Sequence, residues 1–299
     1  MSYHVSVMKD EVTTALDVKR GGLYLDCTLG GGGHTSAILE AGGRVVAIDR
    51  DSDAIEYCKA RLSGDITYIK GQYENAVKLL AENGITKISG AVMDLGVSSH
   101  QLDDPERGFS YMRDGALDMR MDRAQQFSAY DVVNSYSAEE LADIFRKYGE
   151  ESFARRIASA IAAKRKSADI KTTARLADII AGSVPYRKSG HPAKKCFQAI
   201  RIEVNGELKG LYDAITGIFG LIERGGRLAV ISFHSLEDRI VKAAFREFET
   251  DCICPRSMPV CVCNHRAIGK TLGRLRPTQT ELDNNPRSAS ATLRVSEKL

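Results

Sequence analysis

Four residues that could bind parts of a nucleotide-like ligand stand at, or just after, the ends of predicted strands: Asp26, Asp49, Tyr73 and Asp94. A carboxylate at a strand tip can accept hydrogen bonds from both ribose hydroxyls, and an aromatic ring can lie against adenine. Four consecutive glycines, residues 30 to 33, follow the first strand and let the backbone pass close to a ligand. Strand, glycine turn, helix, strand and terminal acid together predict a site for a nucleoside-containing cofactor.

The spacing of the glycines separates two classes of cofactor. A dinucleotide site uses G-x-G-x-x-G and places the pyrophosphate at a helix N-terminus. That spacing is absent here, because Thr35 and Ser36 stand where the third glycine would fall. The carboxylate of Asp26 would also suit an ammonium group better than a phosphate. We therefore expect S-adenosylmethionine, which carries an ammonium, a sulfonium and a ribose but no phosphate, in preference to NAD.

Alternating strands and helices position these residues. Apolar runs predict strands at 23–25, 44–48, 66–69 and 88–93, with helices at 52–62 and 76–83. Near-continuous apolar strands separated by helices are typical of a parallel sheet that is covered on both faces. Ligands of such sheets bind at the carboxyl ends of the strands, where the four residues fall. The expected fold is α/β, with a doubly wound, Rossmann-like sheet.

The alternation stops near residue 105. Residues 106–205 show helical patterns and no convincing strand, and one helix should begin at the capping box of Ser137 and Glu140. Beyond them, the pattern predicts a helix over 207–223 and strands over 227–233 and 291–295. We expect two domains: residues 1–105 with 206–299, which bind the cofactor, and an inserted helical domain, 106–205, which binds the substrate.

The charge is concentrated in the predicted insertion. The whole chain has a net charge of only +3, but residues 155–195 contain 11 basic residues against two acidic ones. Such a segment is typical of a surface that contacts a polyanion. A solvated, Lys-rich helical surface is the alternative.

The seven cysteines are an odd number, which argues against a disulfide framework and favours a reducing cytoplasm. We find neither a membrane-spanning apolar run nor the apolar core of a signal peptide. Four cysteines form the pattern C-x-C-x6-C-x-C: Cys252, Cys254, Cys261 and Cys263. This spacing is near that of zinc ligands, although C-x-x-C is the commoner form. A zinc site is one interpretation, and reduced loop cysteines are the one we favour.

Motifs along nearly the whole chain resemble one family. The most specific stretches are residues 93–103 and 225–242. The others are residues 26–34, 47–51, 107–110, 112–115, 117–121, 148–151, 197–205 and 285–287. On these motifs the chain resembles the bacterial ribosomal RNA small-subunit methyltransferase H family, which methylates the N4 of a cytidine in 16S rRNA. The resemblance implies a seven-stranded class I methyltransferase sheet with an inserted helical domain, acting in the cytoplasm and requiring no metal.

The resemblance also implies a set of residues that bind the methyl donor. Carried over by motif, these are Gly32, Gly33, His34, Asp49, Tyr73, Asp94 and Gln101, and the strand pattern adds Asp26. Phenylalanine is also found in the family at position 73, so an aromatic face is kept. His100 stands where proline is common, which puts the local turn in doubt.

Methylation of a cytosine amine requires positioning of the nitrogen and an acceptor for its proton. We predict that Asp94 is this acceptor or orients the amine. The alternative is that it binds only the ammonium group of the donor. His234 and Glu237 follow the next strand and are predicted to contact the target base, with capping of the following helix as the alternative.

The predicted insertion supplies the remaining candidates. Phe109 and Tyr111 could stack a splayed-out cytosine, or could simply pack under a loop. Arg113, Arg120 and the basic segment 155–195 would contact phosphates. Three other functions stay open: methylation of a protein or small molecule, RNA binding without catalysis, and an NAD-dependent dehydrogenase, which the glycine spacing disfavours. The oligomeric state is also open, with a homodimer among the options.

Overall fold

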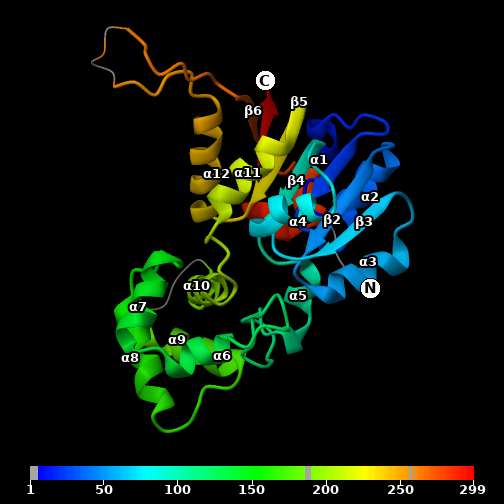
Figure 1. Cartoon of the computed structure of the whole chain (residues 1–299). Coiled ribbons are helices and arrows are strands. Elements are labelled where there is room, and N and C mark those ends of the chain that lie inside the picture. The colour runs from blue at the N-terminus through cyan, green and yellow to red at the C-terminus, as the bar shows by residue number, and fades with distance from the viewer. Residues whose placement is uncertain (1–5, 186–189, 256–257, 259) are drawn as a thin grey trace. The chain divides into compact units, whose positions relative to one another are not determined.

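The computed structural model describes residues 6–185, 190–255, 258 and 260–299 (Figure 1). The chain divides into two compact units, one formed by Met1–Gly96 with Leu208–Leu299 and the other by Val97–Glu207. We call them the sheet unit and the helical unit. The sequence places the first boundary at residue 105, whereas the sheet unit ends at Gly96. The reason is that the loop residues Phe109 and Leu117 pack in the core of the helices, and partly buried Val97 packs against it.

A seven-stranded sheet forms the centre of the sheet unit, with strand order β3-β2-β1-β4-β5-β7-β6. The strands are β1 (Leu23–Asp26), β2 (Arg44–Asp49), β3 (Ile66–Lys70), β4 (Ile88–Asp94), β5 (Ile222–Ser232), β6 (Gly269–Leu275) and β7 (Thr292–Lys298). The first five strands are parallel, while β7 runs antiparallel to both β5 and β6. The α/β class and the four N-terminal strands are as predicted. Strand β6 is missing from the prediction.

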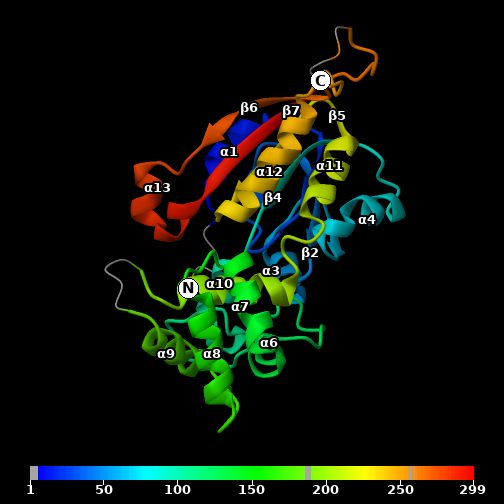
Figure 2. The ribbon, with the colours of Figure 1, turned by 90° about the vertical axis from the view of Figure 1, so that its left-hand side faces the viewer.

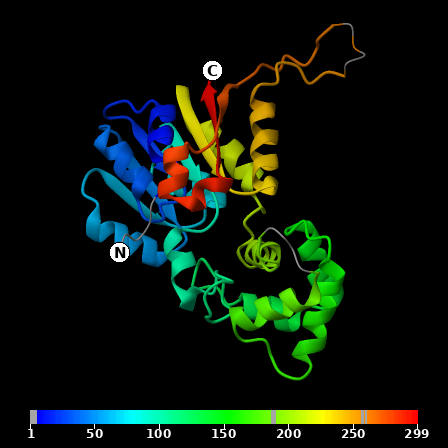
Figure 3. The same ribbon diagram turned by 180° about the vertical axis from the view of Figure 1, so that it is seen from behind.

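Helices cover both faces of this sheet, and successive strand residues point to opposite faces. One face, with Leu25, packs against α4 (Ala76–Glu82), α11 (Leu211–Leu221) and α12 (Ser235–Phe248). The other face, with Tyr24, packs against α1 (Lys9–Leu16), α2 (Gly33–Glu40) and α3 (Ser52–Arg61). Figure 2 shows α11 and α12 side by side, and Figure 3 shows the molecule from behind. Burial on both faces explains the near-continuous apolar runs of the central strands.

The helical unit consists of short helices around its own core. They are α5 (Ser99–Asp103), α6 (Ala129–Ser135), α7 (Ala138–Lys147), α8 (Ala154–Arg165), α9 (Thr173–Ser183) and α10 (Lys194–Asn205). The predicted capping box at the start of α7 is confirmed, because Glu140 N donates to Ser137 Oγ and Ser137 N donates to the Glu140 carboxylate. Within the described part of this unit there is no strand, only one isolated bridge between Ala116 and Thr172. No described helix of the chain is long and apolar enough to cross a membrane.

In the second half of the sheet unit, the predicted helix and the strand after it begin at other residues than expected. Helix α11 begins at Leu211 and not at Glu207, because Gly206 and Gly210 both adopt positive φ angles, 63° and 78°, that end one helix and delay the next. Strand β5 already begins at Ile222, ahead of the turn at Gly225. Neither difference moves the C-terminal end of β5, which is the end that approaches the site.

Candidate functional site

Three carboxylates lie at neighbouring strand tips in the sheet unit. Strand β1 lies between β2 and β4, and Asp26 pairs in register with Ala47 of β2 and Val92 of β4. Asp49 and Asp94 are the last residues of those two flanking strands. The predicted gathering of these acids at one edge of the sheet is therefore confirmed.

Asp49 connects the glycine turn to the C-terminal end of β2 through a hydrogen bond. Gly30 N donates to Asp49 Oδ2 over 2.8 Å, and Asp51 N donates to Oδ1 over 2.8 Å. A carboxylate offers about four lone-pair sites, so each oxygen can still accept another hydrogen bond. Burial raises the pKa of Asp49 to about 6, although the two backbone N–H groups act in the opposite direction. The geometry suits a ligand that presents two adjacent hydroxyl donors.

Asp26 is fully buried, and both of its carboxylate oxygens accept hydrogen bonds from residues around the glycine turn. Its Oδ2 accepts a hydrogen bond of 2.7 Å from Thr35 Oγ1, and its Oδ1 accepts one of 3.1 Å from Thr28 N. Burial raises the pKa of Asp26. These contacts brace the first turn of α2 against β1, so direct contact with an ammonium group stays a prediction. The two threonines are missing from the predicted site, since a hydroxyl in a turn or at a helix start gives no sign of its partner before folding.

His34 and Asp94 form a buried pair beside this turn. His34 Nε2 lies 3.4 Å from Asp94 Oδ2, with the side chains 3% and 11% exposed. Burial alone would lower the pKa of His34, but the hydrogen bond and charge of Asp94, together with the charge of Asp26, outweigh it and raise that pKa. Asp94 N also donates to Thr28 Oγ1 over 2.7 Å, which fixes the strand tip. The contact with Asp94 therefore favours the protonated form of His34.

Two buried polar atoms of this pair lack partners among the described residues. They are Asp94 Oδ1 and His34 Nδ1. Buried polar atoms almost always have a hydrogen-bond partner, and exceptions are concentrated where a ligand or water binds. The free carboxylate oxygen of Asp94 is an acceptor for a cationic or N–H donor. This is the strongest structural sign of a ligand site in the sheet unit.

Tyr73 lies in a 3-10 turn, η1 (Tyr73–Asn75), just after β3. The Arg50 guanidinium lies 5.9 Å from the centre of its ring, and the ring also packs on the core beneath α4 and α11. Arg50 in turn approaches Glu74, with Nη2 3.3 Å from Oε1. These contacts show the packing role of Tyr73, and its contact with adenine stays a prediction.

His234 and Glu237 follow β5 at the same edge, where Asp94 pairs with Ile231. Glu237 N donates to His234 Nδ1 over 3.3 Å, and Phe233 N donates to Glu237 Oε2 over 2.7 Å. His234 Nε2 lies 3.1 Å from Glu237 Oε1. Both residues therefore cap α12, which confirms the capping alternative. Contact with a target base and a catalytic role for His234 stay predictions.

Another donor candidate, Gln101, lies in the helical unit. Gln101 N donates to Ser98 Oγ over 3.2 Å and Ser98 N donates to Gln101 Oε1 over 3.1 Å, a complete capping box at the start of α5. The signature Ser-x-x-Gln was readable in the sequence as a helix start. Binding of the donor by Gln101 stays a prediction.

The aromatic candidates of the helical unit are packed. Phe109 is only 6% exposed in the core of the unit. Tyr111 stacks on the His191 ring at 4.8 Å and meets the edge of Phe197 at 5.7 Å. The packing alternative therefore describes both residues in this structure, and stacking on a base stays a prediction.

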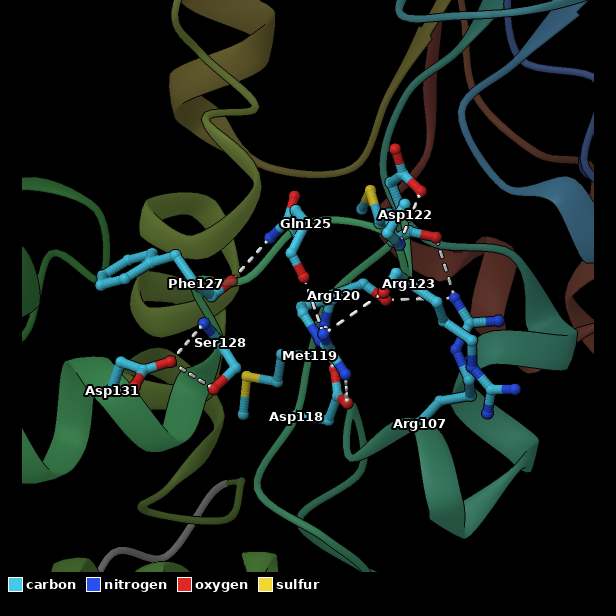
Figure 4. Close-up of polar contacts among 12 residues, drawn as sticks. Arg107, Asp118, Met119, Arg120, Asp122, Arg123, Gln125, Phe127, Ser128 and Asp131 are labelled. Carbon is cyan, nitrogen blue, oxygen red and sulfur yellow. Dashed lines mark hydrogen bonds and ion pairs between the residues drawn. The ribbon is translucent and has the colours of Figure 1, made fainter.

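The two arginine candidates differ in how they are held. Arg120 forms a bidentate pair with Asp118, with distances of 2.9 and 2.7 Å, and its Nη1 donates to Gln125 O over 2.7 Å (Figure 4). Its guanidinium thus fastens the loop before α6. Arg113 is 53% exposed and its Nη2 lies 3.3 Å from Asp103 Oδ1. Phosphate contact stays a prediction for both, and the exposed Arg113 is the better placed.

The basic segment presents its charges to solvent. Eight of its described basic side chains are exposed: Arg155, Arg156, Lys164, Lys166, Lys171, Arg175, Lys194 and Lys195. Arg165 is turned inward and donates to Val133 O. Arg187 and Lys188 lie outside the described residues. At the start of α8, a surface hollow is lined by Arg146, Phe153, Arg155 and Arg156, and Phe153 is 37% exposed.

The fold and the strand-tip acids define an S-adenosylmethionine-dependent methyltransferase. The site fits this donor, because its unpartnered carboxylate oxygen and its crowded acids suit a cationic ligand that has a ribose and no phosphate. Residues 1–299 match the model of the MraW methylase family, and the chain belongs to that family.

Similar proteins share the whole length of the chain. It is 48% identical over 305 residues to "Ribosomal RNA small subunit methyltransferase H" of Clostridium botulinum (strain Loch Maree / Type A3), covering 99% of both chains. Proteins of the same name from Clostridioides difficile (strain 630) and Geobacter sp. (strain M21) are 46% and 48% identical over 308 residues, again covering 99% of both chains. The predicted family, enzyme class and cofactor are confirmed.

Proposed function

We propose that this methyltransferase modifies the exocyclic N4 of a cytidine in the 16S rRNA of the small ribosomal subunit. The names of relatives 46–48% identical over 99% of the chain support the substrate, and the motif resemblance supports the atom. Within the structure, the observation that carries the proposal is the buried, unpartnered Oδ1 of Asp94 beside the His34 imidazole. It is an anionic acceptor at the edge of the sheet where ligands of such folds bind.

Asp94 has the properties that an amine acceptor needs. When bound, S-adenosylmethionine supplies a methyl group on a sulfonium: the C–S bond breaks as a bond to the amine nitrogen forms. The nitrogen lone pair of cytosine is delocalised into its ring, and a hydrogen bond from the amine to Asp94 Oδ1 would direct it. After transfer the amine must lose a proton, and Asp94 can accept it or pass it to water. The alternative role, binding of the donor's ammonium group, uses the same oxygen.

His34 holds the Asp94 side chain in place. Its Nε2 lies 3.4 Å from Oδ2, the oxygen that does not face the proposed ligand. This contact leaves Oδ1, the unpartnered oxygen, available as an acceptor. His34 thus acts as a positioning residue, while Asp49 holds the ribose with the two acceptor positions that its backbone partners leave free.

The helical unit supplies an electrostatic surface for RNA. Its exposed basic side chains match the sequence expectation of a polyanion footprint. The hollow at the start of α8 adds the half-exposed Phe153 beside Arg146, Arg155 and Arg156, a combination that can hold a phosphate and an adjacent base together. We also propose that the reaction takes place in the cytoplasm, and light scattering would test for a homodimer.

Labelled methyl transfer to naked 16S rRNA, free small subunits and whole ribosomes tests the proposal. Nucleoside analysis of the product is expected to give N4-methylcytidine. Label in protein or in another nucleoside would contradict the substrate, and no label in any of them would leave only an RNA-binding role.

The variant Asp94→Asn separates catalysis from donor binding. If Asp94 accepts the amine proton, its transfer rate falls by about 10²–10⁴-fold. Donor affinity, measured by calorimetry, then changes by less than about tenfold, roughly 1.4 kcal/mol. A large loss of donor affinity with an unchanged rate on saturation would instead assign Asp94 to the ammonium group.

A further inference from the structure

Four sulfur atoms converge in the loop between α12 and β6, within the sheet unit. They belong to Cys252, Cys254, Cys261 and Cys263, and all four lie within 4.8 Å of one another. This loop is the orange segment that leaves α12 and returns to β6 in Figure 1. Neither the donor site nor the RNA surface of the proposed function uses these residues.

The spacing of the sulfurs matches tetrahedral coordination. Four thiolates at the Zn–S distance of about 2.3 Å occupy the corners of a tetrahedron with edges of about 3.8 Å. The Sγ–Sγ distances are 3.5 Å for Cys252–Cys261, 3.6 Å for Cys261–Cys263 and 3.8 Å for Cys252–Cys263. Cys254 Sγ also accepts a hydrogen bond of 3.5 Å from Val262 N, and groups that ligate a metal commonly have such second partners.

Ordinary packing does not explain why these sulfurs meet. The other three cysteines, Cys27, Cys58 and Cys196, are buried in apolar cores, whereas none of these four is buried. The apolar side chains of the same loop point outward: Ile253, Val260 and Val262 are 64%, 69% and 66% exposed. A loop without an apolar core of its own needs another source of cohesion, and metal ligation supplies it in small closed segments.

We propose that Cys252, Cys254, Cys261 and Cys263 bind one Zn²⁺ ion in a structural, four-thiolate site. Four Zn–S bonds form, and the four thiol protons pass to the solvent. No oxidant or reductant is required, which distinguishes the site from a pair of disulfides. The ion would close the loop and fix the outward apolar side chains in one arrangement, independently of methyl transfer.

The full chain, without a polyhistidine tag and purified under reducing conditions, tests this site. Elemental analysis is expected to find one zinc per chain, and exchange with Co²⁺ should give the visible absorption of a tetrahedral thiolate complex. The variants Cys254→Ser and Cys261→Ser should each reduce bound zinc to less than about a tenth. Ile253→Ser is the matched control, since it alters an exposed residue between two ligands, and it should retain the full stoichiometry.

Three results would overturn the proposal. The first is a reduced native chain that binds no zinc when the metal is added and shows four freely reactive loop thiols. The second is an intact mass with two disulfides in protein kept at cytosolic glutathione poise. The third is undiminished zinc in both serine variants. Circular dichroism and donor binding of each variant show whether it is folded, so a loss of zinc cannot be mistaken for global unfolding.

Discussion

Acidification from pH 7 to pH 5 should weaken binding of the methyl donor by about tenfold through Asp49 alone. The Asp49 carboxyl has a pKa of about 6 in the free protein, because burial penalises its charge. Its ionised form is the one that accepts hydrogen bonds from both ribose hydroxyls. At pH 7 about nine-tenths of the molecules have that form, and at pH 5 about a tenth do. A ligand that needs the carboxylate therefore loses affinity as the pH falls through 6.

Calorimetric titration with S-adenosylhomocysteine between pH 5 and pH 8 measures this effect. Burial lowers the pKa of His34, but the hydrogen bond and charge of Asp94 outweigh it and raise that pKa above its usual value. Asp26 also has a raised pKa and could add a slope of its own. The variant Asp49→Asn separates the contributions of Asp49 and Asp26 to the pH dependence of binding, since it removes only the contribution of Asp49.

D49N should bind the ligand more weakly at pH 7, by about 10- to 100-fold, because one or two hydrogen bonds to a charged acceptor are weakened. It should then lose much less affinity than the wild type on going to pH 5. If D49N kept the full tenfold dependence, or if the wild type showed none, the assignment of the ribose to Asp49 would be wrong.

Two further predictions concern the turn and the RNA surface. Gly32→Ala should cost about 1–3 kcal/mol of unfolding free energy, since a Cβ there would lie 2.7 Å from Leu62 Cδ1 and 2.8 Å from Cys58 Sγ at φ +75°. Gly84→Ala, at φ +72° with nothing within 4 Å, is the control for backbone strain, and equal loss in both variants by denaturant titration would refute the clash. Charge reversal of Arg155 and Arg156 to Glu should weaken rRNA binding and leave donor affinity unchanged. The slope of log affinity against log salt concentration should become shallower by about one to two. An unaltered slope in a filter-binding series would show that these two arginines do not contact the RNA.

The central strands were predictable because burial on both faces leaves a continuous apolar run. Strand β6 was not, because it is an edge strand whose apolar residues Leu272 and Leu275 are 42% and 45% exposed. Nothing in its composition distinguishes it from a loop, and it becomes a strand only by pairing with β7. The boundary at Gly96 was missed for a similar reason, since only tertiary packing of the loop that follows reveals to which core it belongs.

The positions of the acids of the site were predictable from the sequence, but the hydrogen-bond partners of each acid were not. A strand tip shows where Asp26 lies, whereas its bonds to Thr28 and Thr35 depend on how the turn folds back. His234 shows the same limit: its place after β5 was readable, while its use as a cap required the Glu237 backbone to be in place. The sequence predicts a phosphate contact for Arg120, and only the folded loop shows that its guanidinium also pairs with Asp118, two residues away.

The charges at the sheet edge explain why the site favours a sulfonium ligand over a dinucleotide. Burial raises the pKa of both Asp26 and Asp49; the nearby Asp94 raises that of Asp26 further, and the charges of Asp51 and Asp26 raise that of Asp49 further. In the free protein this crowding is unfavourable, and a ligand with ammonium and sulfonium groups relieves it. A pyrophosphate would add like charge to the same edge and would lack the glycine spacing that lets it reach a helix N-terminus. A cationic donor offsets the cost of holding these carboxylates close together, so the charges at this edge favour such a cofactor.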